Sequence, residues 1–224
     1  MIFRQLHVWI DSVRRPGPEA MAVDEWLLET AVAPVLRIYQ WHGEWASLGY
    51  FGDLTQARNT LPGVSWVRRW TGGGVVDHRA DWTYTVVAPH GEALAGWRGA
   101  ESYRQIHEAL VATLRDESCG VRLSTGEAQT GAAMCFDNPV SHDLVAGDGR
   151  KLAGAGQRRT RHGLLHQGSV ALACAGAESR QRALSLATGL AEAWELRDFQ
   201  APLEHISRLV RERYANTAWT NRRS

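Results

Sequence analysis

The sequence predicts an α+β fold, in which helices flank a mostly antiparallel sheet. Two observations lead to this prediction. Four segments repeat apolar residues at helical spacing, and six shorter segments, bounded by glycine or proline, partly alternate apolar and polar residues. A chain of 224 residues is long enough to bury one sizeable core and short for two. We therefore expect one domain over residues 1–224, without an accessory C-terminal domain.

The helices are expected at residues 19–31, 101–117, 179–190 and 202–214. The strands are expected at 35–39, 64–70, 82–88, 142–146, 151–157 and 164–172. Residues 146–150 read Ala-Gly-Asp-Gly-Arg, a composition that predicts a tight hairpin between the fourth and fifth of these strands. This hairpin places Lys151 at the start of the returning strand. The polar tail, residues 216–224, is expected to fray.

Charge and cysteine usage exclude several function classes. Lysine and arginine total 25 against 24 aspartates and glutamates, and the formal charge of +1 gives no electrostatic footprint for nucleic acid or an anionic membrane. The sequence contains no run of 18 apolar residues, so no membrane span is expected. Cys119, Cys135 and Cys174 form an odd set without metal-ligand spacing. We therefore expect no metal, no disulfide framework and a reducing, cytoplasmic location.

Lys151 is the single lysine of the chain, against 24 arginines. Arginine meets every general need for positive charge here, so the remaining lysine indicates a role for a compact point charge with three donors. It lies in a glycine-rich segment, residues 149–159. The alternative is a lysine left over by a coding bias toward arginine.

A second glycine-rich segment, residues 68–78, contains three consecutive glycines at 72–74. Such a stretch after a strand lets the backbone approach a ligand closely, because no Cβ stands in the way. Arg68 and Arg69 before the glycines and His78 after them place donors on both sides. The spacing is neither a dinucleotide fingerprint nor a P-loop. The alternative is a tight hairpin with surface charges.

Together these segments resemble the catalytic domain shared by lipoate-protein ligases, octanoyltransferases and, more distantly, biotin ligases. That family carries Arg-Arg-x-x-Gly-Gly-Gly-x-Val-x-His, matched at 68–78, and Gly-Arg-Lys-hydrophobic-x-Gly-x-x-Gln-Arg, matched at 149–158. A His-Gln-Gly-Ser strand follows at 166–169, and further matching pieces lie at 21–25, 36–41 and 47–51. The resemblance covers most of residues 20–172. It implies the α+β fold of biotin/lipoate protein ligase catalytic domains.

In this family the lysine of the second motif contacts the carbonyl oxygen of the bound acyl group, and the glycine-rich strand walls the acyl tunnel. The resemblance therefore implies a catalytic Lys151, whose ammonium would stabilise the oxyanion that forms when a nucleophile attacks. The substrate-binding residues that it implies are Arg68, Arg69, Thr71, Gly72, Gly73, Gly74, His78, Gly154 and His166. Two interpretations of His78 stay open: contact with the carboxyl end of the acyl group, or a bond to a buried backbone carbonyl.

Residues 132–139, Ala-Ala-Met-Cys-Phe-Asp-Asn-Pro, resemble the Ala-Cys-Phe-x-x-Pro segment of the cysteine-dependent octanoyltransferases. In those enzymes the cysteine carries the acyl group. The resemblance implies that Cys135 is the nucleophile, and a thiolate near Lys151 would exchange with a thioester without ATP. The alternative is a small buried thiol.

The expected function is transfer of an octanoyl or lipoyl group to a lysine of a lipoyl-domain protein, such as a glycine-cleavage H protein or a dehydrogenase subunit. The donor would be an acyl-carrier-protein thioester or a lipoyl protein, and no cofactor is expected. Residues 79–82 replace the Gly-Asn pair usual in ligases and favour transfer. Two alternatives stay open, an ATP- and Mg-dependent lipoate-protein ligase and a non-catalytic relative that binds lipoyl domains. Asp143 is expected to be a strand-edge or substrate-amine contact.

Overall fold

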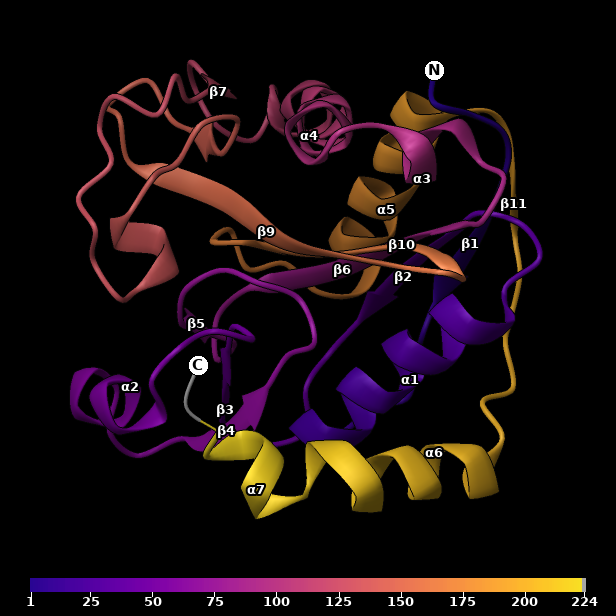
Figure 1. Cartoon of the computed structure of the whole chain (residues 1–224). Coiled ribbons are helices and arrows are strands. Elements are labelled where there is room, and N and C mark those ends of the chain that lie inside the picture. Colours follow the sequence, from indigo (N-terminus) through magenta and orange to yellow (C-terminus); the bar gives the residue numbers. More distant parts are fainter. Residues whose placement is uncertain (223–224) are drawn as a thin grey trace.

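The computed structural model describes residues 1–222, and their main sheet has eight strands in the order β11-β1-β2-β6-β10-β9-β8-β7 (Figure 1). The strands β11, β1 and β2 are parallel to one another, and the pairs from β2 to β7 are antiparallel. The bounds are β1 (Phe3–Ile10), β2 (Val35–Tyr39), β6 (Trp82–Pro89), β7 (Arg122–Leu123), β8 (Leu144–Val145), β9 (Lys151–Thr160), β10 (Gly163–Val170) and β11 (Ala191–Leu196). The predicted fold class is confirmed.

Helices cover both faces of this sheet (Figure 1). One face carries α4 (Gly99–Leu114) and α5 (Gly176–Leu190). The other face carries α1 (Gly17–Thr30), which is covered in turn by α6 (Leu203–Leu209) and the π-helical turn η2 (Val210–Tyr214). The sheet therefore lies between two hydrophobic cores.

Strand β2 shows how the sequence supplies both cores. Leu36 and Ile38 belong to the core under α4 and α5, whereas Val35 and Tyr39 belong to the core against α1. Successive side chains of a strand point to opposite faces, so a strand covered on both sides is apolar on both.

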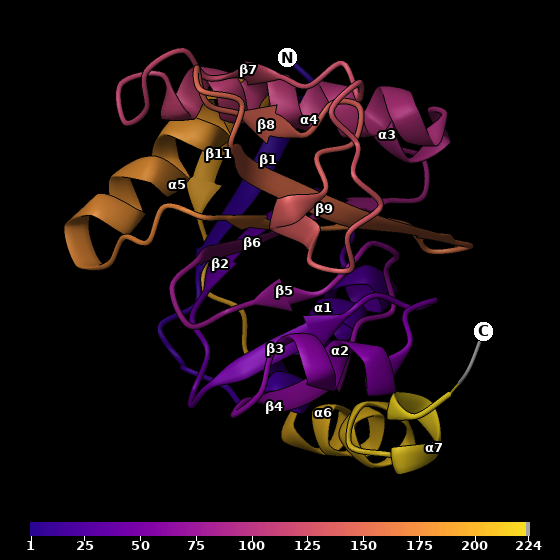
Figure 2. The ribbon, with the colours of Figure 1, turned by 90° about the vertical axis from the view of Figure 1, so that its left-hand side faces the viewer.

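A smaller sheet, β4-β3-β5, lies on the same side of the main sheet as α1 and carries the glycine-rich segment (Figure 2). Its strands are β3 (Trp45–Leu48), β4 (Ser65–Arg68) and β5 (Val76–Asp77). The remaining helical elements are α2 (Leu54–Thr60), α3 (Ala93–Gly96), the 3-10 turn η1 (Cys135–Asp137) and α7 (Thr217–Thr220). Figure 2 shows the segment around η1 between β9 and β5, which brings three distant parts of the chain together.

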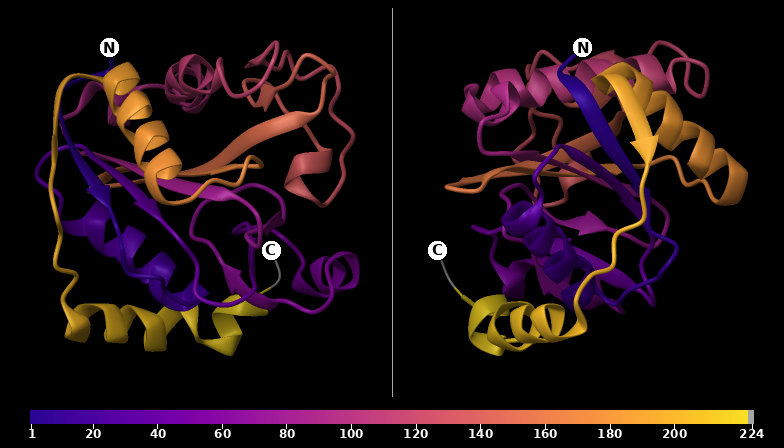
Figure 3. Two further views of the ribbon diagram at one scale, coloured as in Figure 1. Left: turned by 180° about the vertical axis from the view of Figure 1, so that it is seen from behind. Right: turned by 90° about the vertical axis from the view of Figure 1, so that its right-hand side faces the viewer.

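All four predicted helices and all six predicted strands are present; the strand at 35–39 has the predicted ends, the others are shifted at one or both ends, and the helix expected at 202–214 is α6 followed by η2. The prediction missed β1, β3, β5, β7 and β11 and the short helices α2, α3 and α7. Strand β11 is mostly exposed and lies at the edge of the sheet beside β1, before the chain turns to α6 (Figure 3). An exposed edge strand has little apolar alternation, and this explains why the pattern did not reveal it.

The predicted hairpin before Lys151 is confirmed. Val145 of β8 pairs with Lys151 of β9, and the amide of Gly149 donates to the Ala146 carbonyl at 3.0 Å. Gly149 has a φ of 87°, a left-handed conformation that favours glycine. The hairpin fixes Lys151 at the first position of β9.

The prediction that residues 216–224 fray is wrong for the described part of the tail. Arg68 is fully buried and donates to the carbonyls of Trp219, Thr220 and Arg222 at 2.9–3.2 Å. The indole of Trp219 donates in return to the Arg68 carbonyl at 3.1 Å. These bonds dock α7 on β4 because a buried guanidinium needs acceptors for its donors. Residues 223 and 224 lie outside the described residues.

Candidate active site

Cys135 is positioned by the second half of the glycine-rich segment. The Val75 amide donates to the Ala133 carbonyl at 2.9 Å, and the Cys135 amide donates to the Val75 carbonyl at 2.8 Å. A Cβ on Gly74 would lie 2.7 Å from the Ala133 oxygen, so the glycine is what lets the two segments approach. Gly74 thus serves the loop that carries the thiol.

Lys151 meets Cys135 across this junction. Its Nζ lies 3.3 Å from the Cys135 Sγ, 2.6 Å from an Asp143 carboxylate oxygen and 3.4 Å from the Asn138 carbonyl. The lysine is buried, with 4% of its surface exposed. A Cβ on Gly154 would lie 2.7 Å from Lys151 Cε and 2.8 Å from Nζ, so the glycine leaves the space through which the lysine reaches the sulfur.

Asp143 forms an ion pair with Lys151 and holds its ammonium in place. The sequence suggested a strand-edge or substrate-amine contact for Asp143 and did not predict this pair. The carboxylate is fully buried and accepts hydrogen bonds from the Tyr103 hydroxyl at 2.5 Å and the Val140 amide at 2.7 Å. Burial, with the charge of Asp143, raises the pKa of Tyr103 well above its ordinary value, so the phenol remains a donor. His142, with a φ of 70°, precedes it and lies in the left-handed region. The residue before Asp143 therefore accepts a strained backbone conformation.

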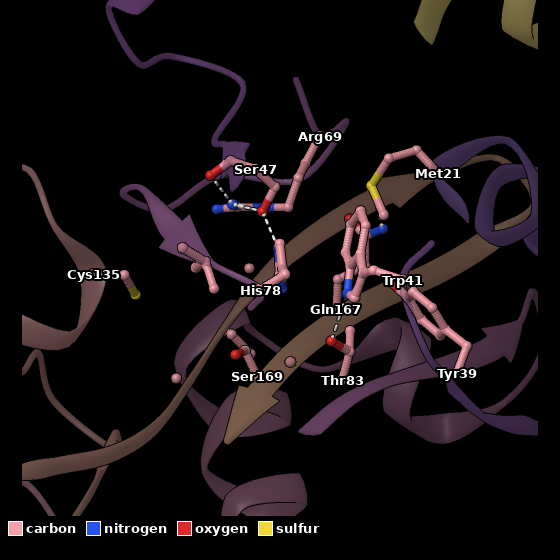
Figure 4. A pocket seen from close by; sticks show the side chains of 15 residues that line it. Met21, Tyr39, Trp41, Ser47, Arg69, His78, Thr83, Cys135, Gln167 and Ser169 are labelled. Carbon is pink, nitrogen blue, oxygen red and sulfur yellow. Dashed lines mark hydrogen bonds between the residues drawn. The ribbon is translucent and has the colours of Figure 1, made fainter. Parts of the chain in front are cut away.

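Cys135 lines a narrow cavity, and its side chain points toward it (Figure 4). The free volume is about 20 Å³, room for one or two water molecules. Walls come from Met21, Tyr39, Trp41, Thr83, Gln167 and Ser169, and from the small residues 154–156 of β9. A wider hollow of about 540 Å³ lies beside it and shares Tyr39, Trp41 and His78. The indole of Trp41 stacks on the His78 ring with 4.0 Å between centroids, and these two rings lie at the boundary of both spaces.

His78 and Arg69 face this cavity, joined by Ser47. The His78 Nε2 lies 2.6 Å from the Ser47 Oγ, and Arg69 donates to the same oxygen at 2.7 Å. The other His78 nitrogen, Nδ1, lies 2.8 Å from the Asp81 carboxylate. The interpretation of His78 as bonded to a buried backbone carbonyl is wrong, since its partners are side chains, and contact with the acyl group stays a prediction. Ser47 and Asp81 were missed because they lie outside the two glycine-rich motifs.

Several residues expected to bind substrate have other positions. Arg68 gives its donors to six backbone carbonyls, those of Gly49, Tyr50, Gly52, Trp219, Thr220 and Arg222. Thr71 is fully buried and donates to Gln167 at 2.8 Å. Of the glycines, Gly72 and Gly74 have carbonyls bonded to Arg69, and the lining of the cavity contains 154–156 in place of 72–74. Residues 72–74 therefore do not line the cavity but position Arg69, which does.

Gly73 has a φ of 97°, in the left-handed region. A Cβ on Gly49 would lie 1.8 Å from the Gly73 carbonyl oxygen, so Gly49 has to be a glycine for the two segments to approach. Gly73 therefore provides the left-handed turn and Gly74 the close approach to the Cys135 loop, whereas a Cβ on Gly72 would meet nothing within 4 Å.

His166 also lies behind the cavity. Its two nitrogens contact the Tyr84 hydroxyl at 3.2 Å and the Gln157 amide at 3.0 Å, and the side chain is fully buried. Burial lowers the pKa of His166 well below its ordinary value. It is placed as a neutral residue of the core, which corrects the expectation that it contacts substrate.

Within residues 1–222, no group of three or more histidine, cysteine, aspartate or glutamate side chains has a metal-binding arrangement. No helix among these residues combines the length and apolar character needed to cross a membrane.

Comparison with known proteins places the chain in a family. The lipoyl protein ligase A/B catalytic domain matches residues 16–214. The chain is 34% identical over 178 residues to octanoyltransferase LipM of Symbiobacterium thermophilum, which covers 73% of this chain and 64% of that protein. It is 37% identical over 169 residues to LipM of Moorella thermoacetica, with 70% and 61% covered. The chain thus spans less than two thirds of the length of these relatives.

Solved structures show the same fold. Ta0514, a putative lipoate protein ligase from T. acidophilum with bound lipoic acid, superposes with a TM-score of 0.70 at 20% identity over 99% of both chains. Lipoate-protein ligase A bound with ATP superposes with a TM-score of 0.65 at 21% identity, again over 99% of both chains. On the match over residues 16–214, this chain belongs to the family of lipoyl protein ligase A/B catalytic domains.

Proposed function

We propose that this chain transfers an octanoyl group, or a lipoyl group, to a lysine of a lipoyl-domain protein through an acyl-enzyme on Cys135. The observation that carries the proposal is the contact of 3.3 Å between the only lysine and a cysteine that lines a cavity. The thiolate is the form of a cysteine that attacks a thioester, and Lys151 lies beside the atom that would carry this charge. The similarity to proteins named octanoyltransferase LipM supports the same reaction.

In the first step the Cys135 thiolate attacks the carbonyl carbon of a donor thioester. A carbon–sulfur bond to Cys135 forms, the carbonyl oxygen becomes an oxyanion, and the donor sulfur then leaves as the tetrahedral intermediate collapses. Lys151 is close enough to the sulfur to reach an oxyanion on the adjacent carbon, and such a donor typically contributes about 10²–10³-fold in rate. One thioester replaces another, so the step needs no ATP.

The acyl chain would enter the cavity beside Cys135, between the small residues 154–156 and Trp41. A free volume of about 20 Å³ holds only one or two waters, so side chains must move to admit eight carbons. Trp41 and His78 border the wider hollow, and we propose that a shift of these rings provides the space.

The donor would be an acyl carrier protein or another lipoyl protein, and the acceptor a lipoyl domain. In the transferase reaction no cofactor takes part, and we infer a cytoplasmic setting from the odd set of three free cysteines. Two protein substrates must then reach the same thiol in turn, which defines a two-step exchange with measurable half-reactions.

Intact-mass analysis after mixing with octanoyl-acyl carrier protein tests the proposal. The wild-type chain should gain one octanoyl group, Cys135→Ala should gain none, and Cys174→Ala should behave like wild type. Parallel samples receive free lipoate with and without ATP and Mg²⁺. Lipoate- and ATP-dependent modification of the lipoyl domain that survives Cys135→Ala would replace the proposal by a ligase reaction, and binding without any transfer would replace it by a non-catalytic role.

A further inference from the structure

Ser47, His78 and Asp81 form a hydrogen-bonded chain along one wall of the cavity, and Figure 4 shows the contact of Ser47 with His78. Asp81 receives bonds on one carboxylate oxygen from His78 at 2.8 Å, Ser169 at 2.6 Å and Thr83 at 3.0 Å. A carboxylate against Nδ1 assigns the imidazole proton to that nitrogen. The Nε2 atom is then the acceptor of the Ser47 hydroxyl hydrogen.

Arg69 completes this orientation. It donates to the Ser47 Oγ at 2.7 Å and to the Ser47 carbonyl at 3.0 Å. A guanidinium has no acceptor, so the hydroxyl hydrogen of Ser47 cannot point toward Arg69. It points toward His78, and the second lone pair of Oγ stays available to a donor in the cavity.

The transfer to an amine needs a proton acceptor, because the attacking nitrogen carries an extra proton in the tetrahedral intermediate. The titratable side chains that line the cavity are Tyr39, Arg69, His78 and Cys135. Burial raises the pKa of Tyr39 well above its ordinary value, a guanidinium stays protonated, and Cys135 is consumed as the thioester. An imidazole is the remaining side chain that can take up a proton near neutral pH.

Lys151 does not fill this need. Its Nζ contacts the carboxylate of Asp143, the sulfur of Cys135 and the carbonyl of Asn138, three acceptors that match the three N–H donors of a lysine. This geometry places Lys151 to stabilise negative charge and leaves the transfer of the proton to another side chain.

We propose that Ser47, His78 and Asp81 form a proton relay that serves the second half-reaction, aminolysis of the acyl-enzyme. The inference rests on the proposed function. The neutral amine of the acceptor lysine attacks the carbonyl carbon of acyl-Cys135 and forms the carbon–nitrogen bond. Its extra proton passes to the Ser47 Oγ while the Ser47 hydrogen passes to His78 Nε2. The carbon–sulfur bond breaks, Cys135 leaves as a thiolate beside Lys151, and His78 later releases its proton to water. Asp81 acts as a positioning residue.

The test separates the two half-reactions. Octanoyl-Cys135 is formed with octanoyl-acyl carrier protein, isolated, and mixed with a lipoyl domain in a rapid-quench device, and both rates are read by intact mass. In His78→Gln, aminolysis should slow by about 10²-fold or more relative to acylation in the same variant, the range expected for general base catalysis. Asp81→Asn should show the same selectivity. Asp77→Asn serves as the matched control, because Asp77 bonds the exposed Arg79.

Two readouts distinguish a relay from a structural role. In His78→Ala, added imidazole should restore aminolysis, because the lost ring leaves a slot against Trp41. In addition, the pH profile of aminolysis in wild type should differ from that in His78→Gln, because a glutamine side chain cannot take up the proton. The charged groups around the ring are Asp81, Asp77 and, through Ser47, Arg69.

Equal losses in both half-reactions, or aminolysis that is unchanged in His78→Gln, would overturn the relay while leaving the acyl-enzyme intact. A wild-type chain that never acquires an octanoyl group would overturn the proposed function and the relay with it. The two failures therefore give different mass spectra.

Discussion

Two buried cations, Arg37 and Lys151, are each paired with carboxylates, yet their surroundings differ. Arg37 is fully buried and donates to Asp11, Asp24 and the Ala20 carbonyl, all fixed parts of the core. Lys151 is held by Asp143 but also contacts Cys135, which lines the cavity. A cation whose partners are all fixed contributes to structure, whereas one that contacts an accessible nucleophile can take part in a reaction.

The largest expected effect is on stability, in the Arg37 cluster. Arg37→Met leaves Asp24 buried without its cation and Asp11 with Arg15 alone, and breaking a buried pair typically costs about 3–5 kcal/mol. Urea unfolding should show this loss, and the protein that remains folded at low temperature should still acylate Cys135. Arg79→Met, which removes an exposed pair with Asp77, is the control and should leave the unfolding midpoint unchanged. If the Arg37 variant were as stable as this control, the Arg37 cluster would not contribute to the free energy of unfolding.

The next effect is on chemistry, in the Lys151 cluster. Lys151→Arg keeps the positive charge, but the planar guanidinium is too broad for the space above Gly154. We expect the acylation rate to fall about 10²–10³-fold, the typical cost of losing one oxyanion donor. Single-turnover acylation measured by intact mass gives the rate, with Arg150→Lys as the control next to it. Activity within twofold of wild type would mean that any cation suffices at this position.

These two clusters also show how far the sequence can be interpreted. Lys151 stood out because lysine is so rare in this chain, and the hairpin residues 146–150 placed it correctly at the start of a strand. Arg37 and its carboxylates were not predicted, because Asp11, Asp24 and Arg37 lie far apart along the chain and meet only in the fold. Pairing of this kind leaves no local pattern.

The same limit applies within the motifs. Arg68 and Arg69 are neighbours, but one docks the tail and the other lines the cavity, since adjacent residues of a strand point to opposite faces. The motif identified both arginines but did not predict that their side chains have different partners and different roles. Asp143 was noticed, but its ion pair with Lys151 was not predicted, because this pair crosses between two strands.

The free energy of unfolding should depend on pH through His107, which contacts the segment that holds Asp143. His107 donates through Nδ1 to the His142 carbonyl at 2.6 Å, directly before Asp143, and burial lowers the pKa of His107 to about 4. The unfolded chain binds this proton near pH 6.5, so the folded state is disfavoured as the pH falls from 6.5 toward 4. The loss in the free energy of unfolding should approach about 3 kcal/mol over that window. Urea unfolding between pH 7 and 4 measures it, and His107→Asn should flatten the slope. An unchanged slope would assign the acid sensitivity to other groups, His166 among them.

The smallest expected effect concerns the space that lets Lys151 reach the sulfur. In Gly154→Ala the new Cβ would lie 2.7 Å from Lys151 Cε, 2.8 Å from Nζ and 3.1 Å from an Asp143 oxygen, so the ammonium must move. Displacing a catalytic group by up to about 1 Å can cost up to about 10²-fold, and a shift of a few tenths of an ångström should cost about tenfold in acylation. Gly96→Ala, where a Cβ meets nothing within 4 Å, is the control for the substitution itself and should leave the rate unchanged.

Single-turnover acylation of both variants decides between two descriptions of β9. If Gly154→Ala acylates as fast as Gly96→Ala, the lysine has another route to the sulfur, and the glycine serves only the cavity wall. If only Gly154→Ala is slow while both variants unfold at the same urea concentration, the position of the Lys151 ammonium sets the acylation rate. Lys151 then takes part in the reaction, whereas Arg37 contributes only to stability.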